Sequence, residues 1–287
     1  MILYKTLLNC RGRLLDLSTP QVMGIINVTP DSFYDGGKLK TDAELLAAAG
    51  KMLEEGAAIL DTGGMSSRPG SQEISESTEL MRVIPAIESI HKNFPESIIS
   101  VDTWRGKVAE EAVQAGASMV NDISGGRFDK NLLSVISKLK VPYVLMHMQG
   151  TPLTMQFNPV YNESGLDDGG VVKEVFDFLK EKILKLNELG MYDIIVDPGF
   201  GFGKTVEHNF GLLNHLDVFK IFGLPMLAGL SRKSMICNVL KVNPHNALNG
   251  TTAINAIALM KGAKLLRVHD VKEARETIQL IEKMKDY

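Results

Sequence analysis

Residues able to bind anions and flat heterocycles recur along this chain, each directly after a short apolar run. In order, they are Asn27, Asp61, Asp102, Asn121 with Asp122, His147, Asp197, Ser231 with Lys233, and Arg267 with His269. The cationic members suit phosphate or carboxylate groups, and the Asp and Asn members suit the N–H edge of a heterocycle. Asn, Asp and Ser often begin loops for local reasons. His147, Lys233 and Arg267 are poor turn formers, which favours a ligand pocket.

The clearest of these positions lies in residues 194–205, IIVDPGFGFGKT. Its β-branched start predicts a strand buried on both faces, and Pro198 and the glycines after Asp197 predict a loop. A carboxylate at the C-terminal end of a core strand is where α/β sheets bind ligands. In isolation, Asp197 could simply cap its own turn, but the same pattern recurs along the chain. Phe202 and Met146 could hold a flat ring between them.

Eight strand-like runs alternate with helical patterns, without a linker-like break. The runs are Val22–Ile26, Ala57–Leu60, Ile98–Val101, Met119–Val120, Tyr143–Met146, Ile194–Val196, Pro225–Leu230 and Lys264–Leu266. Repeated βα units imply a parallel sheet, and this number fits a (β/α)8 barrel formed by one domain over residues 1–287. Residues 1–20 predict a β-hairpin that closes the bottom of the barrel. An open doubly wound sheet is the alternative, but no GxGxxG turn opens a helix.

Composition describes an ordinary globular protein. Of 287 residues, 45% are apolar and 23% are charged, and the net charge is −3. Without a basic excess, a nucleic-acid partner is not expected, and no apolar run reaches the roughly 20 residues that span a bilayer. The N-terminus lacks the apolar core of a secretory signal. The chain has two cysteines, which is typical of a reducing compartment and predicts a cytoplasmic location.

Two other chemistries fit the pattern less well. His147 and His269 have no Cys or His neighbour at ligand spacing, so we do not predict a zinc site. The residues at the strand ends include the Ser, His and Asp that a catalytic triad needs, but the anionic and amide groups suggest binding rather than acyl transfer.

Several longer strings resemble the dihydropteroate synthase family. They are MGIINVTPDSFYDGG (23–37), ILDTGGMSSRPG (59–70), SVDT (100–103), VNDISGG (120–126), VLMHMQGTP (144–152), DPGFGFGKTVEHN (197–209), LAGLSRKSMI (227–236) and RVHD (267–270). They follow the order of the family and run from about Val22 to the final helix. Such a set is far more specific than any single motif.

The resemblance implies a barrel enzyme of folate biosynthesis, usually a homodimer and a target of sulfonamide drugs. Such a transferase joins 6-hydroxymethyl-7,8-dihydropterin diphosphate to p-aminobenzoate and releases pyrophosphate in the presence of Mg²⁺. The diphosphate leaves once its charge is neutralised by a cation and by Arg and His donors. Departure leaves a positive carbon, which Asp102, with Asp35 or Asp61, would stabilise.

The same resemblance assigns the site residues. The pterin would meet Asp102, Asn121, Met146, Asp197, Phe202 and Lys233. The diphosphate would meet Asn27, Arg267 and His269, with Asn27 also close to Mg²⁺. The p-aminobenzoate would meet Phe33, Ser67, Arg68, Pro69 and Ser231, beside Lys233. The catalytic residues would be Asn27, Asp102, Lys233, Arg267 and His269.

One loop departs from the family. Its second loop usually reads Gly-Gly-Glu-Ser-Thr-Arg-Pro, whereas here Met65 replaces the Glu and Ser67 replaces the Thr. Two alternatives stay open. Pterin-binding methyltransferase barrels share the pterin pocket but would have little use for Arg68 or Ser231. A paralogue that binds pterin without turnover would be expected to lack residues such as Asn27, which is present.

Overall fold

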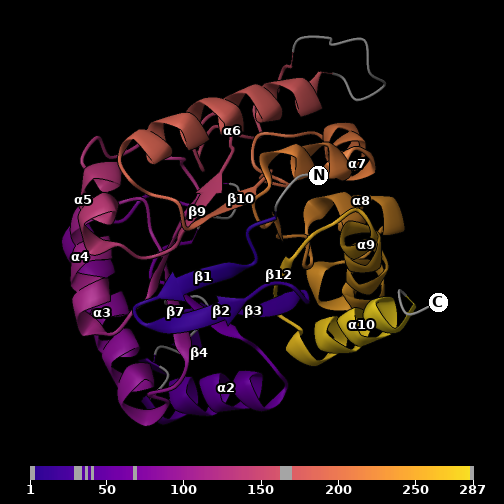
Figure 1. Cartoon of the computed structure of the whole chain (residues 1–287). Helices are drawn as coiled ribbons and strands as arrows, with labels where there is room; N and C mark the ends of the chain where they lie inside the picture. The colour runs from indigo at the N-terminus through magenta and orange to yellow at the C-terminus, as the bar shows by residue number, and fades with distance from the viewer. Residues whose placement is uncertain are drawn as a thin grey trace.

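The computed structural model describes residues 4–28, 42–66, 70–161 and 170–284, with the backbone of two short strands, β4 (Tyr34–Asp35) and β5 (Lys38–Leu39). Within this part of the chain, eight parallel strands form one sheet in the order β10-β9-β8-β7-β6-β3-β12-β11 (Figure 1). An isolated parallel bridge between Val196 and Met226 joins β10 to β11, so the sheet closes on itself. The predicted (β/α)8 barrel is confirmed.

The barrel strands are short and buried on both faces, as expected for a parallel sheet covered by helices. Their bounds are β3 (Gln21–Asn27), β6 (Ile59–Gly63), β7 (Ile98–Asp102), β8 (Met119–Asp122), β9 (Tyr143–Met146), β10 (Ile194–Asp197), β11 (Leu227–Ala228) and β12 (Leu265–Val268).

Helices surround the barrel as an outer ring (Figure 1). They are α2 (Asp42–Glu54), α3 (Glu76–Asn93), α4 (Gly106–Ala115), α5 (Leu132–Leu139), α6 (Val171–Glu188), α7 (Val206–Asn214), α8 (Ser234–Leu240), α9 (Leu248–Met260) and α10 (Val271–Met284), with 3₁₀ turns η1 (Leu216–Phe222) and η2 (Pro244–Asn246). Each buries an apolar stripe against the sheet; α10, for example, buries Val271, Ala274 and Ile278. Three of these helices, α5, α7 and α8, are not predicted from the sequence, because their short lengths give weak periodicity.

The N-terminal hairpin closes the bottom of the barrel, as predicted. Strands β1 (Leu7–Cys10) and β2 (Arg13–Asp16) pair antiparallel. Arg11 and Gly12 turn the chain between them with φ of 56° and 91°, the positive values that a tight hairpin turn requires. Buried hairpin side chains pack on the inward-facing residues at the N-terminal ends of the strands. This cluster includes Leu8, Cys10, Leu15 and Leu17 of the hairpin and Met23, Ile59, Ile98 and Met119 of the barrel.

A polar layer lies directly above this apolar layer. Successive side chains of a strand point to opposite faces, so the residues two positions further along each strand also face inward. In five strands these residues are polar: Asp61, Ser100, Asn121, Asp197 and Arg267. The barrel interior is therefore apolar at the N-terminal ends of the strands and becomes polar two residues further along five of them.

The second barrel strand begins later than predicted. β6 covers Ile59–Gly63, whereas the sequence analysis places it at Ala57–Leu60 with Asp61 at its end. Ala57 instead lies in the connection between α2 and β6, and pairing with β3 and β7 continues to Gly63. Asp61 therefore lies inside the barrel wall, with a relative exposure of 0%.

Candidate active site

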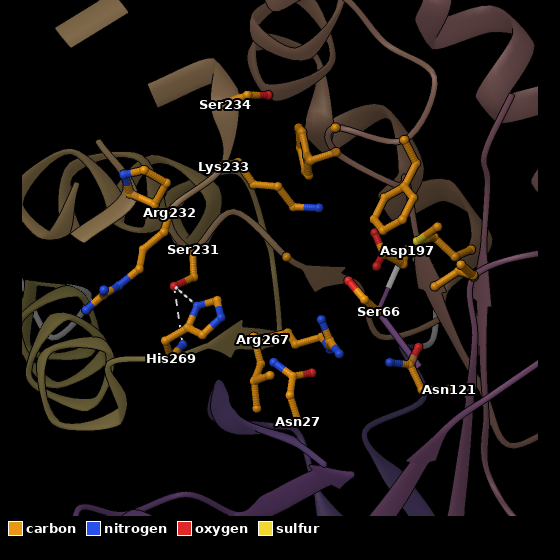
Figure 2. Close-up of a pocket in the computed structure, with 18 of the residues that line it drawn as sticks. Asn27, Ser66, Asn121, Asp197, Ser231, Arg232, Lys233, Ser234, Arg267 and His269 are labelled. Atoms are coloured by element: carbon orange, nitrogen blue, oxygen red, sulfur yellow. Dashed lines mark hydrogen bonds between the residues drawn. The ribbon is translucent and has the colours of Figure 1, made fainter. Parts of the chain in front are cut away.

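A cavity of about 650 Å³ opens at the C-terminal ends of the barrel strands (Figure 2). Residues singled out in the sequence line it: Asn27, Asn121, Met146, Asp197, Phe202, Ser231, Lys233, Arg267 and His269. They come from six of the barrel strands or from the loops after them. The predicted convergence on one pocket is confirmed for these six strands, whereas Asp61, Asp102, Asp122 and His147 are not among the lining residues. The individual roles of the residues stay predictions.

The other predicted residues are not among the lining residues in the described part of the chain. Phe33, Ser67, Arg68 and Pro69 lie outside the described residues, as does the side chain of Asp35. Asp102 is described, and it reaches the site through an ion pair with a lining residue.

The cavity also has lining residues that the sequence analysis does not select. Arg232 and Ser234 flank Lys233, so they could have been predicted by selecting the whole polar run 231–234. Pro244 and His245 belong to η2, which follows α8 rather than a barrel strand. The rule that strand ends carry the site therefore could not find them.

Asp197 is oriented by the backbone of the loop that follows it. The Gly199 N–H donates to Asp197 Oδ1 at 2.7 Å. Gly199 has φ of 74°, and a Cβ added there would lie 1.8 Å from the His147 carbonyl oxygen, so only glycine fits. Burial raises the pKa of Asp197, while the Gly199 hydrogen bond and the charges of Lys233 and Lys204 lower it. The glycine loop thus presents a buried carboxylate to the cavity.

Lys204 holds this loop from behind, a role that the sequence analysis misses. Its Nζ donates to the carbonyls of Gly199 at 2.9 Å and Phe202 at 3.2 Å, and lies 3.1 Å from His147 Nδ1. Lys204 is 2% exposed, and burial lowers its pKa to about 7 against the opposing charge of Asp197. A lysine after a glycine-rich loop normally suggests an exposed residue, so the pattern gives no sign of this contact.

His147 turns away from the cavity. It is 3% exposed, and its ring meets Phe178 edge to face with centroids 5.0 Å apart. Burial, and then the charge of Lys204, lower the pKa of His147 well below its usual value. It therefore forms part of the support behind the glycine loop.

The ammonium of Lys233 lies over the ring of Phe202, with Nζ 4.1 Å from the ring centroid. This is a cation–π contact on a residue that lines the cavity. Burial lowers the pKa of Lys233 to about 8, against the charges of Asp197 and Asp102. An aromatic face, a cation and a carboxylate therefore lie together in one part of the chamber.

Met65 stands where the family resemblance predicts a glutamate. Met65 is 6% exposed and belongs to an apolar cluster beside the cavity. Its buried members are Met65, Trp104, Ile123, Met146, Met148, Met155 and Phe202. A glutamate at this position would bury its charge among thioethers and aromatic rings, which is costly without a partner.

Arg267 lies between two carboxylates. Its Nε donates to Asp61 Oδ2 at 2.6 Å, and its Nη2 donates to Asp102 Oδ2 at 2.7 Å. Asn121 Nδ2 donates to the same Asp61 oxygen at 3.0 Å. Burial raises the pKa of Asp102 to about 7, and the Arg267 charge opposes that rise. One buried network thus connects residues predicted to bind pterin with one predicted to bind diphosphate.

The loops after β11 and β12 are joined by two pairs of side chains. Ser231 Oγ lies 3.0 Å from His269 Nδ1 and accepts from the His269 N–H at 3.2 Å (Figure 2). Arg232 forms a forked pair with Asp270, with Nε–Oδ2 of 3.0 Å and Nη2–Oδ1 of 2.6 Å. These pairs connect the loop that carries Lys233 to the residues that directly follow Arg267.

The described part of the chain lacks two features. No group of three or more His, Cys, Asp or Glu side chains there could hold a metal ion. No helix in the same ranges is long and apolar enough to cross a membrane.

Comparisons with known proteins agree with the geometry. The sequence profile of a family described as pterin binding enzyme matches residues 23–269. Dihydropteroate synthase from Escherichia coli is 44% identical over 274 residues, covering 95% of this chain and 94% of that protein. This chain therefore belongs to the pterin-binding enzyme family and, within it, to the dihydropteroate synthases.

Solved structures show the same relationship. The Yersinia pestis dihydropteroate synthase in complex with a sulfonamide drug has a TM-score of 0.90 and 42% identity, covering 98% of this chain and 100% of that one. The Xanthomonas albilineans enzyme with 4-aminobenzoic acid has a TM-score of 0.89 and 40% identity, covering 98% and 99%. This chain therefore shares its fold with solved dihydropteroate synthases.

Proposed function

We propose that this transferase condenses 6-hydroxymethyl-7,8-dihydropterin diphosphate with p-aminobenzoate, giving 7,8-dihydropteroate and pyrophosphate. The observation that carries the proposal is that one cavity holds Asn121 and Asp197 together with Lys233 and Arg267. The acceptors suit the N–H edge of a flat heterocycle, and the cations suit a diphosphate. The name shared by the relatives supports the same reaction.

The pterin lies over Asp197 and Asn121. Because Gly199 occupies Asp197 Oδ1, Oδ2 is left to accept from the amino and ring N–H groups of the pterin. Met146 and Phe202 supply the apolar faces for the ring. Lys233, already over the Phe202 ring, donates to a ring acceptor, and Asp102 accepts from a pterin N–H group.

Arg267, His269 and Asn27 bind the diphosphate end. The amide oxygen of Asn27 is a hard donor suited to Mg²⁺, and no acidic cluster among the described residues would hold the ion without substrate. This donor set fits an ion that enters with the diphosphate. When bound, Mg²⁺ neutralises charge on the leaving diphosphate.

The chemistry then needs little proton transfer from the protein. The C–O bond to the diphosphate breaks with its electron pair on oxygen, where Arg267 and His269 stabilise the growing charge. The methylene carbon becomes positive, and the carboxylate of Asp102 stabilises it. The arylamine nitrogen of p-aminobenzoate forms the new C–N bond and loses its proton to water, so no strong base is needed.

The p-aminobenzoate carboxylate lies at the end of the cavity formed by Ser231 and Lys233. We expect p-aminobenzoate also to contact four residues of the first two loops, which are Phe33, Ser67, Arg68 and Pro69. Ser234 lines the same end and begins α8, which adds a hydroxyl beside Lys233.

A coupled pyrophosphate-release assay tests the reaction. Purified protein is incubated with the pterin diphosphate and Mg²⁺, with and without p-aminobenzoate, and the product is identified by mass. Pyrophosphate release that requires p-aminobenzoate, with a product containing both halves, is the expected result. Release without incorporation of the arylamine, or no turnover at all, would contradict the proposal.

We also propose a homodimer. Exposed apolar side chains lie on α8, α9 and α10, which follow one another on one flank of the barrel (Figure 1). They are Val239, Leu240, Ile257, Met260 and Leu280. Light scattering at micromolar concentration should give twice the chain mass, and Ile257→Glu should favour the monomer. A wild-type monomer would contradict this assembly.

The cytoplasmic location stays a prediction from the cysteine content and the N-terminal pattern. Fractionation of cells that express the chain, followed by immunodetection in the cytosolic fraction, tests it.

A further inference from the structure

Arg267 has two carboxylate partners with different access to the cavity. The side chain of Asp61, which meets the arginine Nε, is 0% exposed. The side chain of Asp102, which meets Nη2, is 10% exposed, and that of Arg267 is 19% exposed. One partner is therefore sealed inside the barrel wall, and the other lies at the end of β7 beside the cavity.

Asp61 carries two hydrogen bonds on one oxygen. Its Oδ2 accepts from Arg267 Nε and Asn121 Nδ2. Its Oδ1 is buried without a hydrogen-bond partner among the described residues. A buried carboxylate is costly unless it is paired. The Arg267 cation is therefore the contact that Asp61 can least easily lose.

The two ends of the guanidinium suit two different tasks. Nε is next to the aliphatic stem, so pairing it with Asp61 fixes the direction of the whole group. Nη1 and Nη2 lie at the tip, from which they can meet a ligand in a forked geometry. Figure 2 shows Arg267 and Asn121 directed into the same cavity from β12 and β8.

We propose that Asp61 is a positioning residue that holds Arg267 throughout the reaction, whereas the Arg267–Asp102 pair is exchanged for contacts with the substrate. This inference rests on the proposed function. In the chain without substrate, Arg267 and Asp102 satisfy one another. When the pterin diphosphate binds, Asp102 accepts from the pterin and the guanidinium tip donates to the diphosphate.

The exchange leaves Arg267 and Asp102 each with new hydrogen-bond partners. Arg267 moves one donor from a carboxylate to a phosphate oxygen, and Asp102 moves from a cation to N–H donors of the pterin. Only Asp61 keeps its partner, so Arg267 does not have to find its orientation again in each turnover. Asp61 also orients Asn121, whose amide oxygen is then free to accept from the pterin.

The variant Asp61→Asn tests the anchor. It keeps the shape and an oxygen that can accept from Asn121, but it loses the charge that holds Arg267. We expect kcat and the affinity for pyrophosphate each to fall about tenfold or more, while affinity for a pterin without diphosphate stays within about threefold. Equal losses for both ligands, or normal kcat, would overturn the proposal.

A double-mutant cycle separates positioning from a general structural effect. If Asp61 acts through Arg267, adding Asp61→Asn to Arg267→Lys should lower kcat by no more than about threefold further. If the two substitutions instead lower kcat by independent factors that multiply in the double variant, the proposal is overturned. The matched control is Glu79→Gln, because Glu79 is also 0% exposed and pairs with Arg105 outside the cavity. It should lower stability but keep kcat within about threefold.

A measurement on the wild-type protein covers the case in which Asp61→Asn does not fold. In protein labelled with ¹⁵N-arginine, the Arg267 Nε–H signal, assigned with Arg267→Lys, should stay protected from solvent exchange after pyrophosphate and pterin bind. Loss of protection on binding would overturn the anchor. Turnover by the wild-type protein tests the proposed function separately, so the two failures are distinguishable.

Discussion

The two sides of the cavity are held in place by different kinds of contact. On the pterin side, formed by Asp197, Phe202 and the loop 198–204, the positioning contacts use the backbone. Gly199 donates to Asp197, and Lys204 donates to two carbonyls of the loop. On the anion side, formed by Ser231, Arg267 and His269, side chains hold other side chains.

This difference matches what each side has to bind. Backbone hydrogen bonds around glycines with positive φ cannot rearrange without rebuilding the loop, so the pterin side is pre-organised for one flat shape. Pairs of charged side chains can exchange partners when a charged ligand arrives. The anion side can therefore release its internal pairs to a diphosphate, whose charge grows as the bond breaks. Variants on each side of the cavity test this division.

The largest effect is expected on the anion side, from Arg267→Ala. It should lower kcat by about a hundredfold or more, because it removes donors that stabilise the leaving diphosphate. Asn27→Ala should lower kcat to a similar degree. Affinity for a pterin without diphosphate, measured by calorimetry, should stay nearly constant. Arg267→Lys keeps the charge without the fork and should lose less. Near-normal turnover of the alanine variants would show that the division is wrong.

On the pterin side, Asp197→Asn should weaken pterin binding by at least about tenfold, because charge-assisted hydrogen bonds contribute roughly 1.5–3 kcal/mol each. The amide keeps the shape and still accepts from Gly199, so folding should be little affected. Calorimetry with a pterin that lacks the diphosphate measures this effect alone, because such a ligand makes no contact with the diphosphate-binding residues. An unchanged pterin affinity would show that Asp197 does not bind the pterin.

The support behind the loop predicts a pH dependence of stability. Burial lowers the pKa of Lys204 to about 7 in the folded chain, whereas an unfolded lysine titrates near ~10.4. Between these values the unfolded chain binds the extra proton, so stability should rise with pH, by up to about 1.4 kcal/mol per pH unit. Below about pH 7 both states are protonated, and this contribution no longer changes.

Urea unfolding at pH 7, 8 and 9 measures that slope. Lys204→Met should flatten it, while Lys180→Met, which replaces an exposed lysine on α6, should leave it unchanged. Identical slopes in the wild type and Lys204→Met would mean that Lys204 keeps its proton in the folded chain.

The smallest effect is expected from Asp270→Asn, which weakens the forked pair with Arg232. The pair is partly exposed, with side-chain exposures of 25% and 16%, so its loss should cost about 1 kcal/mol or less. The loops after β11 and β12 should loosen, raising KM for p-aminobenzoate about twofold to threefold with pterin affinity unchanged. A larger loss of pterin affinity would mean that the two sides are not independent.

Much of the fold follows from the sequence because eight repeated βα units fit a closed barrel, and no GxGxxG turn favours the open doubly wound sheet. The polar residues at the strand ends then converge, since parallel strands end at the same face. The positions of short helices α5, α7 and α8 do not follow, because fewer than three turns give little periodic signal. The residues of η2 join the cavity without any local mark.

The sequence by itself determined the barrel, its hairpin and nine of the residues that line the cavity. Only the tertiary structure decided which of these face ligand and which support them. Asp61 and Arg267 are 206 residues apart and meet because β6, β3 and β12 are neighbours in the closed sheet. His147 and Lys204 carry groups typical of a site, but they are buried behind it. A strand pattern fixes the alternation of side chains, whereas the starting residue of each strand and the partners across the barrel depend on register and closure.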